Sequence, residues 1–175
     1  MSCRMKLFPY FSVLLLLAMG GCVGLPPHAG LAAPQPVFSP QAFFTGATMG
    51  DGVLRVAFSH ARQVHVVGRG HVEADGTLVL VQRVEQSGRP ARSRTWTLRP
   101  SDNGRFSGTL SDARGPVAAD VHGNTFHVRF TAQGGLGIEQ WLYLQPGGAT
   151  VLNRMVVRKF GITVAALRET IRRAP

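Results

Sequence analysis

From Gly52 to the C-terminus, apolar and polar residues alternate with a period of two, which is the pattern of β-strands. Residues 125–131 follow this alternation strictly, whereas residues 78–84 are apolar on both faces. Turn dipeptides separate the runs at regular intervals: Asp75-Gly76, Ser87-Gly88, Asn103-Gly104, Gly123-Asn124, Gly134-Gly135 and Gly147-Gly148. The pattern predicts roughly eight to ten short strands.

Short strands with short connections predict an all-β fold, an antiparallel barrel or a strongly curved sheet. Parallel strands would need crossover helices, and the loops between these runs are too short to hold them. The segment Ile162–Arg173 is ambiguous, because Val164, Leu167 and Ile171 also fit one face of a helix. We favour a strand there, since a closing strand would cover a free sheet edge.

The first 21 residues have the layout of a secretory signal peptide. Arg4 and Lys6 precede the apolar run 7–19, which is too short for a membrane span of roughly 20 residues. The sequence Leu-Ala-Met-Gly-Gly-Cys that ends at Cys22 resembles the lipobox of bacterial lipoproteins, in which the cysteine takes a diacylglyceryl group before cleavage. We therefore expect cleavage before Cys22 and a lipid on its thiol.

Two other interpretations of the N-terminus stay open. Secretion without lipid would place cleavage after Gly20 or near Ala33, and an uncleaved N-terminal helix is the third possibility. A lipid anchor would hold the protein to a membrane on the periplasmic face of the cell envelope. Val23 is not the aspartate that resembles an inner-membrane retention signal in some bacteria, so the outer membrane is favoured over the inner one.

The expected mature chain has a tether and one domain. Residues 22–40 are rich in proline and read as a lipidated N-terminus with an extended tether. Residues 41–175 are long enough to form one β-barrel domain with its own core. With Cys3 removed and Cys22 lipidated, no intrachain disulfide is available, so the core must stabilise the fold.

The chain is basic, with 19 lysines and arginines against 9 acidic residues and a formal charge of +10. Such a charge attracts polyanions. At a cell envelope the nearest polyanions are phospholipid or lipopolysaccharide head groups, and we expect no nucleic-acid partner. A general compositional bias toward arginine would explain the same excess.

No local motif for a catalytic nucleophile or a nucleotide site is present. His122 and His127 are five residues apart, so in a strand they would point to opposite faces. His65 and His71 are expected on either side of a turn at Gly68-Arg69-Gly70. We therefore expect no metal site, no cofactor and no catalytic residues.

The acidic residues Asp112, Asp120 and Glu139 are interpreted as solvated turn and rim residues. Arg94 and Trp96 share strand parity, so a tryptophan in the core would bring the arginine to the same face. An arginine there either pairs with an anion or holds its head in water at the mouth of the barrel.

Three segments near the C-terminus resemble a known family: Gln140–Leu144, Val151–Arg154 and Arg158–Gly161. They are similar to a family of bacterial lipoproteins known only as domain of unknown function 3833, and the likeness extends from about Phe43 to the C-terminus. The resemblance implies a lipid-anchored, lipocalin-like β-barrel and brings no established activity.

The candidate ligand-lining or structural residues combine these observations: Arg94, Trp96, Trp141, Tyr143, Asn153, Arg154 and Lys159. Trp141 and Tyr143 share one face, and Asn153 and Arg154 point opposite ways, so only one of them faces inward. Lys159-Phe160-Gly161 is expected to form a turn.

The function that we expect is non-catalytic binding or presentation of a hydrophobic, acyl-type ligand, because barrels of this size can enclose one small ligand. One alternative is a structural or assembly lipoprotein with a packed core that contacts envelope proteins. Another is an enzyme acting on a lipid-like substrate, which would need converging groups such as Asp112 and His122.

Overall fold

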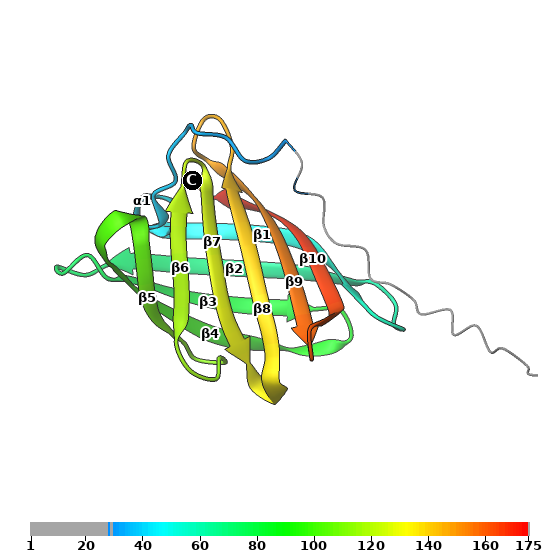
Figure 1. Cartoon of the computed structure of the whole chain (residues 1–175). Coiled ribbons are helices and arrows are strands. Elements are labelled where there is room, and N and C mark those ends of the chain that lie inside the picture. The colour runs from blue at the N-terminus through cyan, green and yellow to red at the C-terminus, as the bar shows by residue number, and fades with distance from the viewer. Residues whose placement is uncertain (1–27, 29, 175) are drawn as a thin grey trace, which may run out of the picture.

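Ten antiparallel strands pair in chain order, and the last strand pairs with the first to close a barrel. This computed structural model describes residue 28 and residues 30–174 (Figure 1). The strands are β1 (Gly46–Val56), β2 (Arg62–Val72), β3 (Leu78–Gln86), β4 (Arg89–Pro100), β5 (Arg105–Leu110), β6 (Val117–His122), β7 (Thr125–Ala132), β8 (Leu136–Leu144), β9 (Thr150–Lys159) and β10 (Ile162–Arg173). The expected all-β, lipocalin-like barrel is thereby confirmed.

The C-terminal segment is a strand, β10, and not a helix. It pairs with β9 on one side and with β1 on the other, where Gly50 lies opposite Ile171. All six turn dipeptides identified in the sequence lie between strands, and the Phe160-Gly161 turn joins β9 to β10. The alternating pattern therefore predicts both the strands and most of their connections.

One expected turn is wrong. Gly68, Arg69 and Gly70 lie inside β2, so His65 and His71 are on one continuous strand. A Cβ atom on Gly70 would collide with the carbonyl oxygen of Phe44. The glycine is there because another backbone segment packs directly against the strand.

One end of the barrel is closed by a short helix, α1 (Pro40–Phe44), which begins at the capping residue Ser39. The Ser39 hydroxyl accepts a hydrogen bond of 3.2 Å from the Ala42 backbone N–H. The rings of Phe38, Phe43 and Phe44 pack together, with Phe38 stacked on a phenylalanine of β7 at 5.6 Å between centroids. These rings form the top of the apolar core.

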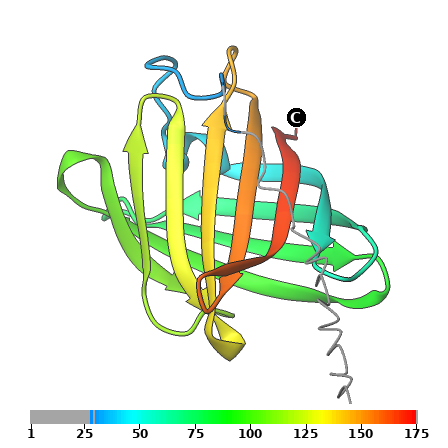
Figure 2. The ribbon, with the colours of Figure 1, turned by 45° about the vertical axis from the view of Figure 1, so that its right-hand side comes forward.

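The described part of the N-terminal segment lies on the same end of the barrel (Figure 2). Asn124, in the β6–β7 turn, accepts a hydrogen bond from the Ala33 N–H at 2.7 Å and donates one to the Leu31 carbonyl at 2.9 Å. Phe38 is only 2% exposed. Much of the stretch expected as a tether thus packs on the barrel, and the lipid site expected at Cys22 lies outside the described residues.

The opposite end of the barrel is open. It carries the β1–β2, β3–β4, β5–β6, β7–β8 and β9–β10 turns, whereas the other four connections and both ends of the described segment lie at or beside the closed end. Within residues 30–174 no helix is long and apolar enough to cross a membrane. The open end is where the barrel interior meets solvent.

Candidate functional site

A pocket of about 590 Å³ opens at this end of the barrel. Its wall is mostly apolar, with side chains from β1, β3, β7, β8, β9 and β10: Leu54, Val84, Phe130, Ile138, Met155, Val157 and Val164. Arg62, Arg89 and Arg92 line its rim, and the carboxylate nearest to them is Asp112, 3.8 Å from Arg92. An apolar wall that ends at a deeper cation, Arg94, suits a molecule with a long apolar part and an anionic end.

The floor of this pocket is formed by Arg94, which belongs to a polar group inside the barrel. Arg94 donates from Nε to the side-chain oxygen of Gln82 at 2.9 Å, and the Trp96 indole N–H donates to the same oxygen at 2.8 Å. The Arg94 guanidinium also lies 5.4 Å from the centroid of the Trp96 ring. One buried amide oxygen therefore orients both the cation and the aromatic ring.

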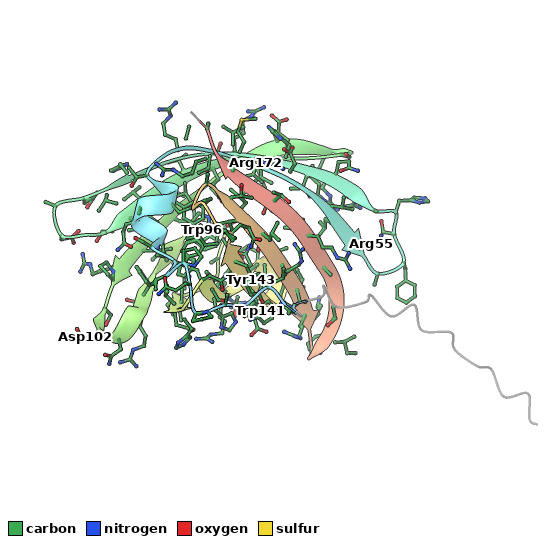
Figure 3. All side chains as sticks on the ribbon, turned by 90° about the horizontal axis from the view of Figure 1, so that it is seen from above. Arg55, Trp96, Asp102, Trp141, Tyr143 and Arg172 are labelled. Atoms are coloured by element: carbon green, nitrogen blue, oxygen red, sulfur yellow. The ribbon has the colours of Figure 1, made fainter. Side chains whose placement is uncertain are left out.

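Strand register brings these three side chains together. Gln82 on β3 lies directly opposite Arg94 on β4, and Leu80 lies opposite Trp96. Because residues two apart share a face, Arg94 and Trp96 both point into the barrel, as their parity predicts. Trp96, labelled in Figure 3, is 6% exposed. Arg94 is only half-buried because its head reaches the pocket.

A second polar pair lies in the barrel interior, where it lines one small cavity together with Gln82 and Arg94. Asn153 on β9 lies opposite Glu169 on β10, and its amide donates to the Glu169 carboxylate at 2.8 Å. Both are buried, at 1% and 6% exposure. Gly52 on β1 leaves room for Glu169, since a Cβ there would lie 2.9 Å from the Glu169 Cβ and 2.6 Å from the Arg168 carbonyl oxygen.

The electrostatics of the floor favour an added anion. Burial raises the pKa of Glu169 above its ordinary value, since a charged carboxylate is poorly solvated there. Burial lowers the pKa of Arg94, although an arginine stays protonated. Among the described residues, no carboxylate lies within 4.0 Å of Arg94, and its two terminal nitrogens make no hydrogen bond. The cation is thus only partly satisfied by the protein.

Behind the floor, toward α1, the barrel interior is almost full. The remaining cavity is about 40 Å³, and Gln82, Gln140, Asn153 and Glu169 line it with apolar neighbours. The Asn153 Oδ1 atom is buried there without a hydrogen-bond partner among the described residues. A space of this size suits ordered water rather than a chain of carbon atoms. Room for a ligand lies in the open half.

Several expected site residues lie elsewhere. Trp141 and Tyr143 are on the outer face of β8, where the His28 ring contacts both and its Nδ1 lies 2.8 Å from the Tyr143 hydroxyl (Figure 3). Arg154 is also on the outer face, because it directly follows Asn153 on β9 and Asn153 points inward. Lys159 ends β9 at the open end. Of the seven candidates, Arg94 lines the pocket, and Trp96 and Asn153 line with it the small cavity behind the pocket.

The expectations for His122 and His127 are wrong. They do not share a strand, because the Gly123-Asn124 turn separates β6 from β7, and both approach Asp120, at 3.4 and 3.8 Å. His127 also contacts Glu139 at 2.9 Å. These groups form an outer ion-pair network, and no set of three or more potential metal ligands occurs in the part of the chain that the structure describes.

The suggested acid–base pair does not form either. Asp112 lies in the β5–β6 turn at the open end, whereas His122 ends β6 at the closed end. The two side chains are therefore separated by the length of a strand. The pair given as an example for the enzyme alternative is therefore not formed.

Gln82, Gln140 and Glu169 line the small interior cavity and were not among the seven candidates. Each is a buried polar side chain on an inward-facing position of its strand. The signal was present in the alternation, since Gln82 shares parity with Leu80 and Val84. Such a site is indicated by a polar residue at a strand position whose neighbours two residues away on either side are apolar.

Comparisons with known proteins agree on the fold. The S-type phycobiliprotein lyase CPES from Guillardia theta aligns with a TM-score of 0.63 at 10% identity, covering 79% of this chain and 94% of that one. A DUF3598-family protein of unknown function from Nostoc punctiforme PCC 73102 aligns with a TM-score of 0.60 at 12% identity, covering 83% of this chain and 53% of that one. No curated protein matches the chain.

At these identities the likeness shows the lipocalin-like fold alone. The family comparison reaches further, since it covers nearly the whole sequence. Residues 16–173 match the family described as protein of unknown function (DUF3833), and the chain belongs to that family.

Proposed function

We propose that this protein is a non-catalytic binding protein for a small anionic amphiphile, such as a fatty acid or another acyl compound, and that it acts at the cell envelope from a lipid anchor on Cys22. The observation that carries the ligand proposal is Arg94, a cation on the floor of an apolar pocket. Its two terminal nitrogens make no hydrogen bond to the residues that the structure describes. An acyl carboxylate would supply the missing acceptors.

The head group is assigned to the floor on energetic grounds. A guanidinium can bind a carboxylate through two parallel N–H donors, and such a bond strengthens where water is excluded. Gln82 and Trp96 hold the Arg94 side chain in place before a ligand arrives. Glu169, with its pKa raised by burial, opposes an incoming anion less than an ordinary carboxylate would.

The acyl chain is assigned to the open half of the barrel. The pocket volume of about 590 Å³ lies within the roughly 300–1,000 Å³ that small-molecule sites occupy. Leu54, Met155 and Ile138 would contact the chain, and the rim arginines would lie beside its outer end. Their contacts are apolar and non-directional, so the site should accept a range of chain lengths.

Two measurements test this proposal. Lipids extracted from the purified full-length protein are identified by mass spectrometry, and binding of oleate is measured by displacement of a fluorescent fatty acid. Arg94→Gln should weaken oleate binding about 10- to 100-fold, because a hydrogen bond to a charged group contributes roughly 1.5–3 kcal/mol. Arg94→Lys should recover part of that loss.

Arg69→Gln is the matched control, because Arg69 lies on the outer face of β2 and is exposed. It removes the same charge from the same protein without touching the pocket. Equal oleate affinity of the wild type, Arg94→Gln and Arg69→Gln, together with an absence of co-purified lipid, would refute the proposal.

A second candidate function is assembly through contacts with envelope proteins. It is favoured by an apolar strip on the outer wall, where Met49, Val67 and Val81 on β1, β2 and β3 are 45%, 43% and 47% exposed. A photoreactive amino acid at position 81, compared with one at position 129 on the far wall, tests it. A specific cross-linked protein partner from position 81 alone would favour this function.

A further inference from the structure

Two turns at the open end expose aromatic side chains almost completely. Phe58, in the β1–β2 turn, is 88% exposed, and Phe160, in the β9–β10 turn, is 92% exposed. These are the highest exposures among the large hydrophobic residues that the structure describes. Ile162, next to the second turn, is 69% exposed. An apolar side chain held this far into water has a cost unless something covers it.

The two turns are close neighbours on the rim. They belong to adjoining hairpins, because β10 pairs with both β1 and β9. The Ala57 N–H also donates to the Val164 carbonyl at 2.9 Å, which joins the base of the first turn to the start of β10. The two exposed rings therefore come from adjoining turns on one side of the pocket mouth.

Both phenylalanines also occupy an unfavourable backbone conformation. Their φ angles are 56° for Phe58 and 51° for Phe160, in the left-handed region that asparagine and glycine adopt readily. A bulky side chain there is uncommon, and strained positions concentrate at functional surfaces. Stability alone would favour a smaller, polar residue at each of these turns.

The residues around the turns are basic. Within the five turns of the open end and the two residues on either side of each, the basic side chains are Arg55, Arg62, Arg89, Arg114, Arg158 and Lys159, and the acidic ones are Glu85 and Asp112. Arg55 lies near the end of β1 (Figure 3), and the Lys159 ammonium is 5.7 Å from the Phe160 ring. The closed end is more balanced, with three acidic residues in its turns: Glu73, Asp75 and Asp102.

We infer that the rim formed by the β1–β2 and β9–β10 turns docks on the surface of an anionic phospholipid bilayer. Phe58, Phe160 and Ile162 enter the interfacial region, where amphipathic and aromatic side chains are stable. Lys159, Arg55 and Arg62 lie beside the lipid phosphates. The pocket mouth then faces the bilayer, so a ligand can pass between the two without crossing water.

This inference does not depend on whether the pocket binds an acyl compound. Docking requires the rim residues alone, whereas the proposed function requires Arg94. Arg94→Gln should therefore leave docking unchanged while it weakens oleate binding, and the two proposals can fail separately.

Hydrogen exchange of the full-length protein on vesicles tests the docking. Amide exchange is measured for residues 57–61 and 159–163 without vesicles, on phosphatidylcholine, and on phosphatidylcholine with phosphatidylglycerol. The β8–β9 turn, residues 145–149, is the internal reference, because it lies at the other end of the barrel. Both rim turns should exchange more slowly on the anionic vesicles, and the reference turn should not change.

Phe58→Asn with Phe160→Asn is the decisive variant. Asparagine tolerates the left-handed backbone, so the variant should fold and unfold at the same or a higher temperature than the wild type. The slowing of exchange should fall about tenfold for each ring removed. Burial of one phenylalanine side chain strengthens binding by at least about a factor of ten. Val37→Asn, which removes an exposed apolar residue (59%) at the closed end, should leave it intact.

Lys159→Glu provides an independent variant that keeps both rings. It should weaken protection on the anionic vesicles and have little effect on phosphatidylcholine, because it reverses one charge at the rim. Docking is refuted if the rim turns exchange equally fast with and without anionic vesicles. Full protection in both the double asparagine variant and Lys159→Glu would refute it as well.

Discussion

Asn153 on β9 and Glu169 on β10 face each other across the strand pair, and the Asn153 amide donates a 2.8 Å hydrogen bond to the Glu169 carboxylate. The pair is buried in the middle of the barrel, where a charged carboxylate is poorly solvated. The contact accepts either protonation state of Glu169, because an acid and a carboxylate both offer an oxygen to the amide. Because burial disfavours the charged form of Glu169, the stability of the fold depends on pH.

Glu169→Gln should make the protein more resistant to high pH. Burial raises the pKa of Glu169 in the folded state, so the folded protein holds this proton more tightly than the unfolded chain does. The stability that Glu169 contributes is complete below the pKa of the group in the unfolded chain. It falls as pH rises through the pKa in the folded protein, by about 1.4 kcal/mol for each unit by which the two pKa values differ.

Urea unfolding across pH 4 to 9 measures this effect. The wild type should lose stability over that window, and the glutamine variant should show a flatter profile because it has no proton to lose. Glu85→Gln, at an exposed position of β3, is the control and should follow the wild type. Parallel profiles for wild type and Glu169→Gln would contradict the expected coupling.

Gly52→Ala should destabilise the barrel by about 1–3 kcal/mol, the usual cost of overpacking a filled interior. The added methyl group would lie 2.6 Å from the Arg168 carbonyl oxygen and would push against Glu169. Gly137→Ala is the matched control, since the nearest contact of its Cβ is an ordinary 3.9 Å. Thermal unfolding distinguishes them, and equal melting temperatures would show that β1 and β10 separate easily.

Asn124→Ala should loosen the N-terminal segment and lower the free energy of unfolding by about 1–3 kcal/mol, the cost of leaving buried polar groups unsatisfied. The Asn124 side chain bonds to the backbone of Ala33, Leu31 and Leu144 and is only 3% exposed. Amide exchange in residues 31–38 should accelerate more than exchange in β3. Uniform acceleration would instead indicate a purely global effect.

Cys22→Ser should abolish lipid modification in bacterial cells and reduce membrane retention to what the rim turns alone provide. The lipobox-like sequence places the acyl acceptor at this thiol, and serine cannot take its place. Metabolic labelling with palmitate and fractionation of the envelope measure the two outcomes. Cys3→Ser is the control and should be labelled normally, because Cys3 lies in the segment expected to be removed. Labelled, membrane-bound Cys22→Ser would exclude this anchor.

Much of the fold is predictable from two-residue periodicity and turn chemistry. The strict alternation in β7 predicts the inward positions of its phenylalanines, and the parity of Arg94 and Trp96 predicts that both face the interior. Local rules suffice here because each strand has one plainly apolar face. The lipoprotein interpretation stays a prediction.

The failures have a common physical cause. In β8, residues 138, 140 and 142 compete with residues 139, 141 and 143, and both faces carry apolar side chains. The outer face is apolar because His28 covers Trp141 and Tyr143, a contact between segments far apart in the sequence. Likewise, Asn153 meets Glu169 only through the register of two strands. The alternation of residues predicts which face of a strand is apolar. Strand pairing and contacts between distant segments decide which residues that face contacts.

The pairing of β1 with β10 has a consequence for how the chain reaches its native state. Contacts between the first and last strands have a high contact order, which slows folding. Until the final strand has emerged, β1 and β9 both remain unpaired edges, open to association with other chains. Folding to completion must therefore follow synthesis of the last strand.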